Sequence, residues 1–183
     1  QITIGTTDYL LVNIYNENTE HKQLKLIDRI DAHIDAIRAD SHESVVLAGN
    51  FNFYFDKKLE SQGGNPETKI HSIAKFISMK EKYDLCDIWR DKNPDAKRFT
   101  FRQKHRAGFL QKRFNYIFIS NHLQSNVNKV DIRNAVRYDH SPIFMDLSTD
   151  EPLLTKGSGF WKFNSSSTKN PAFNAGIIRL IID

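Results

Sequence analysis

The stretch Leu47-Ala48-Gly49-Asn50-Phe51-Asn52-Phe53 is the most informative part of this chain for its fold. It continues an apolar run that begins at Val45 and that is typical of a buried β-strand. The strand is expected to end at Gly49, where polar residues begin. A second polar string, Tyr138-Asp139-His140-Ser141-Pro142-Ile143, occurs much later in the chain. Taken alone, polar residues of this kind at the ends of strands are typical of turns.

The rest of the chain alternates between helix-like and strand-like patterns. Spacings of three and four predict an amphipathic helix over residues 20–38, whose apolar face carries Leu24, Ile27, Ile30, Ile34 and Ile37. The same periodicity predicts a second helix over residues 70–82. Short strands are predicted at residues 9–15, 45–48, 99–101, 114–119 and 143–147. Helices between strands indicate a layered α/β fold.

The composition indicates one soluble domain. A chain of 183 residues can bury a sizeable core but is short for two domains. The net charge of +4 is too small to demonstrate a nucleic-acid partner by itself. The single cysteine, Cys86, excludes an internal disulfide and a multi-cysteine zinc site. No apolar run is long enough to cross a membrane and residues 1–9 lack a signal-peptide pattern, so we expect an intracellular protein without a membrane partner.

Together, the two strings resemble the G-D-x-N and S-D-H-x-P motifs of the endonuclease/exonuclease/phosphatase superfamily, with Asn50 in place of an aspartate. Four more strings resemble the apurinic-like endonuclease domain of non-LTR (LINE-type) retrotransposon polyproteins and the segment that follows it: Asp87-Ile88-Trp89-Arg90, Phe99-Thr100-Phe101, Arg113-Phe114-Asn115-Tyr116-Ile117-Phe118 and Gly159-Phe160-Trp161-Lys162-Phe163-Asn164. The resemblance implies an α/β fold that is part of a four-layer α/β/β/α sandwich (DNase I-like), mainly its C-terminal half. Residues 1–149 would form this part, and residues 150–183 a linker or tail toward a missing downstream region.

The resemblance also implies roles for individual side chains. Tyr15, in the string Asn13-Ile14-Tyr15, and His140 would contact the scissile phosphate. Asn52 would position the attacking water and the phosphate. Asp139 would bind the expected metal, Mg²⁺ or Mn²⁺, through oxygen. The candidate catalytic residues are Tyr15, Asn50, Asn52, Asn115, Asp139 and His140.

Two asparagines are expected to weaken this chemistry. Asn50 stands where the family has the aspartate that directs the attacking water, and an amide cannot take a proton. The expected loss is that of general-base catalysis, about 10²- to 10⁴-fold. Asn115 replaces the aspartate that holds the histidine, and its amide stabilises an imidazolium less than a carboxylate does. The arrangement of the side chains is therefore expected to be retained, whereas the rate of hydrolysis is expected to fall.

The family's N-terminal half, which supplies a metal-binding glutamate, has no counterpart that we can recognise in this chain. We therefore expect metal binding by this fragment to be weak. An inner sheet face without a partner sheet is also expected. Such a face would associate with the missing half or with a second copy of the chain.

A basic segment runs from Lys97 to Arg113 and contains no acidic residue. Such a run is often only a solvated face. In the family, however, this hairpin region lies against DNA, where basic side chains neutralise backbone phosphates. The candidate DNA-binding residues are Arg98, Arg102, Lys104, Arg106, Lys112 and Arg113.

Three functions are compatible with these observations. The leading hypothesis is a Mg²⁺-dependent DNA endonuclease that nicks DNA for target-primed reverse transcription and is impaired in this copy. The second is a catalytically dead remnant that binds DNA or has a structural role. The third, a superfamily phosphatase, is disfavoured by the retrotransposon-like tail. A retrotransposon origin would also predict a nuclear location.

Overall fold

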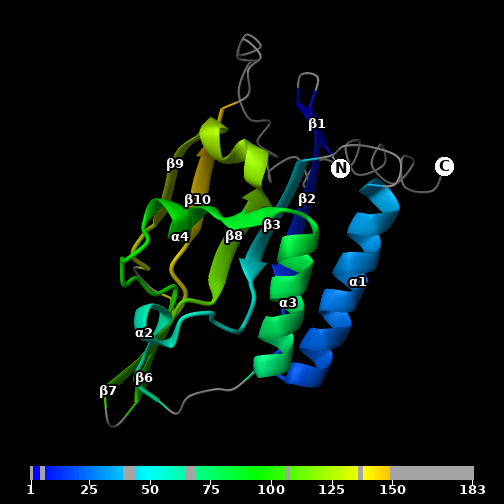
Figure 1. Cartoon of the computed structure of the whole chain (residues 1–183). Helices are drawn as coiled ribbons and strands as arrows, with labels where there is room; N and C mark the ends of the chain where they lie inside the picture. The colour runs from blue at the N-terminus through cyan, green and yellow to red at the C-terminus, as the bar shows by residue number, and fades with distance from the viewer. Residues whose placement is uncertain are drawn as a thin grey trace, which may run out of the picture. The chain divides into compact units, whose positions relative to one another are not determined.

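A five-stranded sheet forms the centre of the fold in a computed structural model, which describes residues 2–4, 7–38, 44–64, 69–105, 108–135 and 138–148 (Figure 1). Its strands, in spatial order, are β1 (Ile2–Ile4), β2 (Thr7–Tyr15), β3 (Ser44–Asn50), β8 (Asn115–Ser120) and β5 (Leu85–Asp87). β2 and β3 are parallel, whereas β8 is antiparallel to β3. A parallel pair requires a crossover, which the helix between β2 and β3 provides.

Two helices, α1 (Glu20–Arg38) and α3 (Ile70–Lys82), lie side by side on one face of this sheet (Figure 1). They confirm the two predicted helices. Ile27, Ile30 and Ile34 of α1 are buried in the main core, as their spacing predicts. Phe51 lies at the centre of an aromatic cluster in this core, and its ring contacts those of Phe53, Phe76, Tyr116 and Phe118 edge to face.

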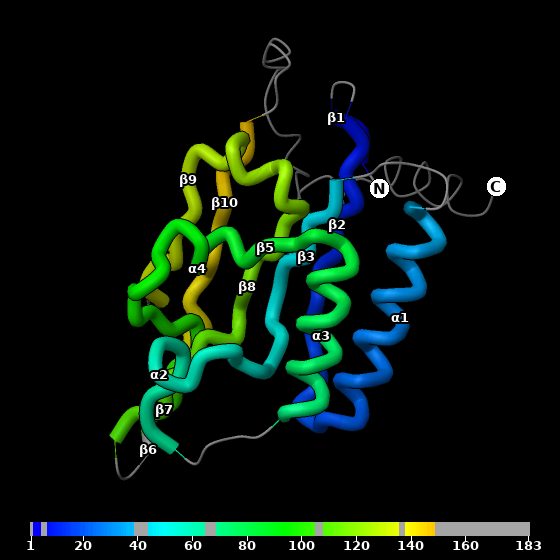
Figure 2. Tube along the Cα trace, viewed as in Figure 1, coloured from blue at the N-terminus to red at the C-terminus, as the bar shows by residue number. Residues whose placement is uncertain are grey.

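The opposite face of the sheet is partly covered by a two-stranded sheet of β9 (Val127–Ile132) and β10 (Ile143–Leu147) (Figure 2). Apolar residues of this second sheet pack against Ile117, Ile119 and Val46. The expectation of a wholly uncovered inner face is therefore wrong near β3 and β8. It arose because polar residues interrupt the apolar pattern of β9, so that the strand was not predicted. Toward β2 the face is open, since Leu11 is 53% exposed.

A third, small sheet has the order β4-β7-β6, formed by β4 (Ser61–Gln62), β7 (Gly108–Lys112) and β6 (Phe101–His105). The strand predicted at residues 99–101 is thus observed at Phe101–His105, further toward the C-terminus. The side chains of β6 from 102 to 104 are polar and exposed, so no apolar alternation marks the strand. Short helices complete the described part of the chain: α2 (Lys57–Glu60), α4 (Ile88–Lys92) and a 3₁₀ helix (Asn121–Asn126).

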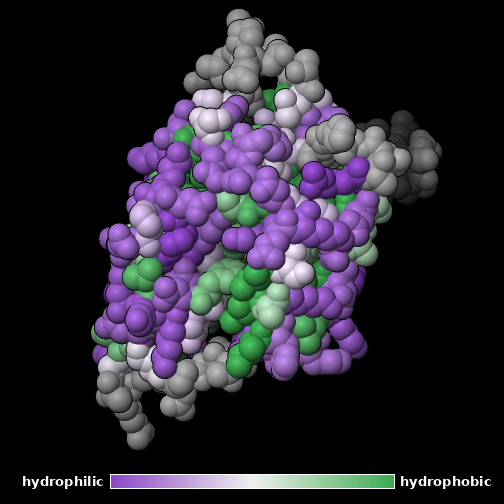
Figure 3. Space-filling model, in the orientation of Figure 1, coloured by the Kyte–Doolittle hydropathy of each residue, from purple (hydrophilic) through white to green (hydrophobic). Residues whose placement is uncertain are grey.

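Apolar side chains gather on the surface over α3 (Figure 3). Ile70 and Ile77 of this helix are 65% and 38% exposed. Beside them is a cleft of about 420 Å³ whose lining includes Phe55, Leu59 and Phe118. The contacts of the chain separate Gln1–Asp150 from Glu151–Asp183. The predicted linker or tail at 150–183 lies outside the described residues.

Gly49 permits the close approach of β3 to β2. Its φ angle is +141°, a region that side chains of L-amino acids rarely enter. A Cβ at this position would lie 1.9 Å from the backbone oxygen of Ile14. No other residue type can therefore replace Gly49 without moving the two strands apart.

We expect Gly49→Ala to lower the free energy of unfolding by about 3 kcal/mol or more, because it adds a backbone clash to the strain of its φ angle. Gly108→Ala is a matched control, since its φ is +125° but a Cβ there meets nothing within 4 Å. The control should lose only about 1–2 kcal/mol. Urea unfolding followed by circular dichroism measures both, and equal losses would contradict the role assigned to Ile14.

Candidate functional site

Three candidate residues lie side by side at neighbouring strand ends. Tyr15 of β2 is in register with Asn50 of β3, and Asn50 is in register with Asn115 of β8. The core between the sheet and the helices contains Ile14 and Tyr116, which are the chain neighbours of Tyr15 and Asn115. Because side chains alternate along a strand, the three candidates point to the opposite face of the sheet. They form a row across one end of the central sheet.

His140 extends this row from a different segment. It forms an isolated antiparallel bridge with Phe101, and the rings of the two residues lie 5.1 Å apart. Backbone hydrogen bonds on either side, from Arg102 N to Asp139 O and from Ser141 N to Thr100 O, hold the segment. The result is a distance of 2.9 Å between His140 Nδ1 and Asn115 Oδ1. The structure therefore brings together the histidine and the asparagine that the sequence motifs pair.

Thr100 is a site residue to which the sequence motifs assign no role. Its side chain is completely buried, and its Oγ1 accepts hydrogen bonds from the backbone N–H groups of Phe114 and Asn115, both at 2.8 Å. One hydroxyl thus fixes the backbone of Asn115, while the Thr100 carbonyl holds the His140 segment through Ser141. The string Phe99-Thr100-Phe101 is recognisable in the sequence, but its partners lie in other segments.

Asn52 occupies a left-handed backbone conformation with a φ of +54°. Asparagine tolerates this region better than most residues. Its N–H donates to Asn50 Oδ1 at 3.0 Å, and its Nδ2 donates to the carbonyl of Asn16 at 2.6 Å. The carbonyl of Asn52 accepts from Nζ of Lys69 at 2.8 Å and from Nε2 of Gln23 at 3.4 Å. Asn50 and Asn52 are therefore buried parts of one fixed turn.

The two asparagines of the row each have one free side-chain donor. Asn50 Oδ1 accepts from Asn52, and Asn115 Oδ1 contacts His140. Within the described part of the chain, no hydrogen bond uses Nδ2 of Asn50, Nδ2 of Asn115 or Nε2 of His140. Tyr15 is 79% exposed, so its hydroxyl is open to solvent.

A basic cleft of about 580 Å³ is lined in part by Asp139 and Ser141, the two chain neighbours of His140. Its lining includes Lys97, Arg98 and Arg102 together with Asp139. Arg98 is held by the Ile132 carbonyl at 2.9 Å and by Asn134 Oδ1 at 2.7 Å. Lys104 is exposed on β6, whereas Arg106 lies outside the described residues.

Two of the predicted DNA-binding residues are not on this surface. Lys112 is only 5% exposed, and its Nζ lies 5.4 Å from the ring centres of Tyr54 and Phe114. Arg113 is 1% exposed. The assignment of these two residues to a DNA-binding surface is therefore wrong. The sequence shows a continuous basic run, but strand alternation and the turn before β8 direct these side chains inward.

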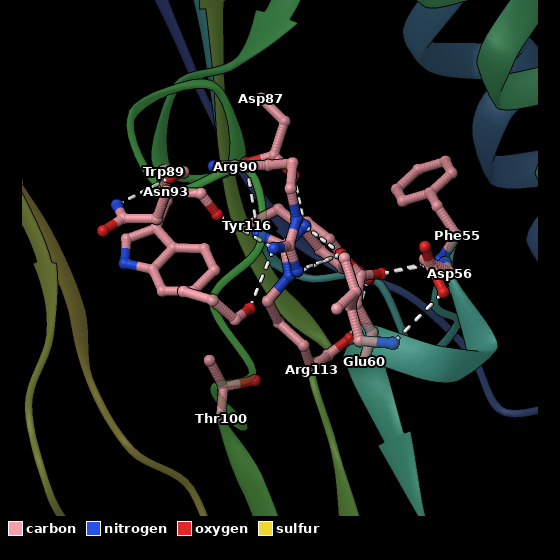
Figure 4. A network of polar contacts seen from close by, with 12 residues as sticks. Phe55, Asp56, Glu60, Asp87, Trp89, Arg90, Asn93, Thr100, Arg113 and Tyr116 are labelled. Atoms are coloured by element: carbon pink, nitrogen blue, oxygen red, sulfur yellow. Dashed lines mark hydrogen bonds and ion pairs between the residues drawn. The ribbon is translucent and has the colours of Figure 1, made fainter.

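Arg113 lies at the centre of a buried polar network (Figure 4). Its Nε donates to Glu60 Oε1 at 2.9 Å and its Nη1 to Asp87 Oδ1 at 3.2 Å, while Nη2 contacts both carboxylates. Burial lowers the pKa of Arg113, but the neighbouring carboxylates more than offset this and keep it above its usual value. The other Glu60 oxygen accepts from the N–H of Phe55 at 2.9 Å and from the Tyr116 hydroxyl at 3.0 Å. Burial raises the pKa of Tyr116 well above its usual value.

The site residues do not fit a bound Mg²⁺ well. Among the described residues, no group of three or more His, Cys, Asp or Glu side chains could hold a metal ion. Asp139, the predicted ligand, lines the basic cleft. The amide oxygens of Asn50 and Asn115 already have partners. Mg²⁺ prefers carboxylate oxygens, so this donor set is poor for it.

No known family model matches the chain. The transposon TX1 uncharacterized 149 kDa protein from Xenopus laevis is 28% identical over 165 residues, which cover 90% of this chain. This chain spans only 12% of that protein's length.

Two solved structures share the fold of this chain. The 3′-5′ exonuclease NExo from Neisseria meningitidis matches with a TM-score of 0.59 at 17% identity. The 3′ phosphatase NExo from Neisseria, bound to a product DNA hairpin, matches with a TM-score of 0.56 at 18% identity. Each match covers 76% of this chain and 61% of the other.

The chain therefore shares the DNase I-like fold of these two structures. This confirms the predicted fold class, and the similarity to a transposon protein confirms the predicted resemblance to a retrotransposon protein. None of the described helices of this DNase I-like domain is long and apolar enough to span a membrane.

We expect Arg113→Met to lower the free energy of unfolding by about 3–5 kcal/mol, because it leaves two buried carboxylates without their cation. Arg98→Met makes the same chemical change at a partly exposed arginine and should cost less than about 1 kcal/mol. Chemical denaturation of both variants measures the difference. A similar loss in the two variants would show that Arg113 is not the structural centre described above.

Proposed function

We propose that this chain is the phosphodiester-binding part of a DNA endonuclease domain of the LINE type, which nicks DNA to prime reverse transcription. The observation that carries the proposal is the row of Tyr15, Asn50 and Asn115 with His140 bonded to its end. Similarity to a transposon protein supports the proposal, as does a fold shared with a phosphatase whose structure contains DNA.

Each member of the row has a role in this proposal. Tyr15 and His140 present a hydroxyl and an imidazole Nε2 to a phosphate placed over the sheet end. Asn115 orients the ring of His140 through their 2.9 Å contact. Asn52, held by Asn16 and Lys69, fixes the turn that carries Asn50.

Asn50 accounts for weak hydrolysis in this proposal. Its side-chain oxygen accepts from the Asn52 N–H, so it stabilises the turn and has no charge with which to direct a water. Asn115 likewise keeps the position of His140 but supplies no negative charge to a protonated ring. The resemblance implies Mg²⁺ with Asp139 as its ligand, but the donor set described above is poor for this ion.

We expect the Asn50→Asp, Asn115→Asp double variant to nick supercoiled plasmid at least about 10²-fold faster than the unchanged chain, because it restores the water-directing and histidine-holding carboxylates. The assay is conversion of supercoiled to open-circular DNA in Mg²⁺. The same double variant with His140→Ala serves as the control for contaminating nuclease. Equal rates for the unchanged chain and the double variant would refute the impairment.

A DNA-binding remnant without catalysis is the second candidate, and the basic cleft favours it. Arg98 and Arg102 line that cleft, and Lys104 is exposed nearby on β6. The fold shared with the 3′ phosphatase NExo is also compatible with the third candidate, a phosphatase. The nuclear location and association through the open part of the sheet near Leu11, with a second copy or an N-terminal half, stay predictions.

For a surface that binds phosphates, the affinity for a DNA duplex should fall steeply with salt. Replacing both Arg98 and Arg102 with Gln should make the slope of log K against log salt shallower by about 0.9 for each phosphate that the variant no longer neutralises. Lys25→Gln, an exposed change on α1, should leave the slope unchanged. Fluorescence anisotropy of a labelled duplex measures these slopes, and a flat salt dependence of the unchanged chain would remove the cleft from the proposal.

A further inference from the structure

The two asparagines reverse the polarity of the row. Carboxylates at the positions of Asn50 and Asn115 would offer negative oxygen atoms to a cation. The amides instead have their oxygens occupied, by the Asn52 N–H and by His140, and their Nδ2 groups are left without a hydrogen-bond partner in the described part of the chain. The free side-chain groups of the two asparagines are therefore N–H donors, which cannot ligate a metal ion.

A buried cation lies beneath the same turn. Lys69 is 6% exposed, and its Nζ is 2.8 Å from the carbonyl oxygen of Asn52. The Asn52 N–H in turn contacts Asn50, so the ammonium group is coupled through one residue to the row. Lys69 thus helps to fix the turn that positions Asn50 at the sheet end.

The spacing of the donors suits one phosphate group. Asn50 and Asn115 are directly paired across antiparallel strands, where Cα atoms of paired residues lie about 4.5–5.5 Å apart. Their side chains share one face, and His140 is in contact with Asn115. Adjacent N–H donors of this kind bind phosphate oxygens, which are strong acceptors.

We propose that this site binds a backbone phosphate of DNA directly, through Nδ2 of Asn50 and Asn115 with His140 beside them, and does so without a divalent metal ion. The inference rests on the proposed function, since it assumes that DNA is the ligand. It departs from the resemblance, which implies a metal between phosphate and carboxylates. The same substitutions that lower hydrolysis thus make the site a metal-independent phosphate receptor.

The test is the binding of a labelled DNA duplex in Mg²⁺ and in EDTA, at ionic strength matched with NaCl. The unchanged chain should bind with dissociation constants that agree within about twofold in the two buffers, because its row carries no carboxylate to neutralise. The Asn50→Asp, Asn115→Asp variant should bind about tenfold more weakly in EDTA and recover in Mg²⁺, since like charges near the phosphate cost of this order.

A charge-matched control separates local from overall repulsion. Ser125→Asp with Asn128→Asp also adds two negative charges, at exposed positions beyond the opposite end of β8. This control should bind like the unchanged chain in both buffers. Thermal melting of each variant verifies that it is folded before its affinity is compared.

The possible failures are distinct. Binding of the unchanged chain that disappears in EDTA overturns this inference but leaves DNA as the partner. Equal binding of the unchanged chain and the aspartate variant in EDTA also overturns it, because the phosphate would then be bound elsewhere in the basic cleft. No DNA binding in either buffer overturns both this inference and the proposed function.

Discussion

The ion pairs of Arg113 with Glu60 and Asp87 hold together the segments on which the site depends. A buried guanidinium is tolerated only when charges and hydrogen bonds compensate for its lost hydration. Here the partners come from α2 and from the end of β5, while Arg113 itself lies between β7 and β8. The second oxygen of Glu60 binds the backbone at Phe55, in the segment that follows Asn50 and Asn52. One charge network therefore ties the strand end that carries Asn50 to the strand that begins with Asn115.

The row at the sheet end shows how geometry and charge can be separated. Asparagine and aspartate have nearly the same shape, so Asn115 still contacts His140 and Asn50 still receives the N–H of Asn52. The difference lies in the charge that the free side-chain atoms present to a ligand. A carboxylate attracts cations and protons, whereas a free amide N–H₂ attracts anions. In the proposed function, the row keeps its geometry while the free groups of its asparagines suit an anion better than a cation.

The fold by itself does not decide between hydrolysis and binding. Identities of 17% and 18% to the two NExo structures establish a shared architecture, which places the strand ends and the loop with His140 in space. Activity depends on which side chains stand at those places. Of the six predicted catalytic residues, four match the motifs (Tyr15, Asn52, Asp139 and His140), whereas Asn50 and Asn115 stand in place of aspartates. The departures from the motifs therefore carry more functional information than the agreement.

The sequence by itself determined the two long helices, the strands β2, β3, β8 and β10, and the identity of the candidate residues. Apolar spacing located α1 and α3 because a helix that packs on a sheet must repeat its buried face every three to four residues. Motif order paired Asn115 with His140, and the structure brings them together. Only the tertiary structure decided which polar residues face the site. Arg98 and Arg113 belong to the same basic run, yet Arg98 lines a cleft while Arg113 is buried. The difference comes from acidic partners in remote segments, which local sequence cannot show. Side-chain direction and long-range pairing follow from packing, because burial of a charge is decided by what the whole fold places around it.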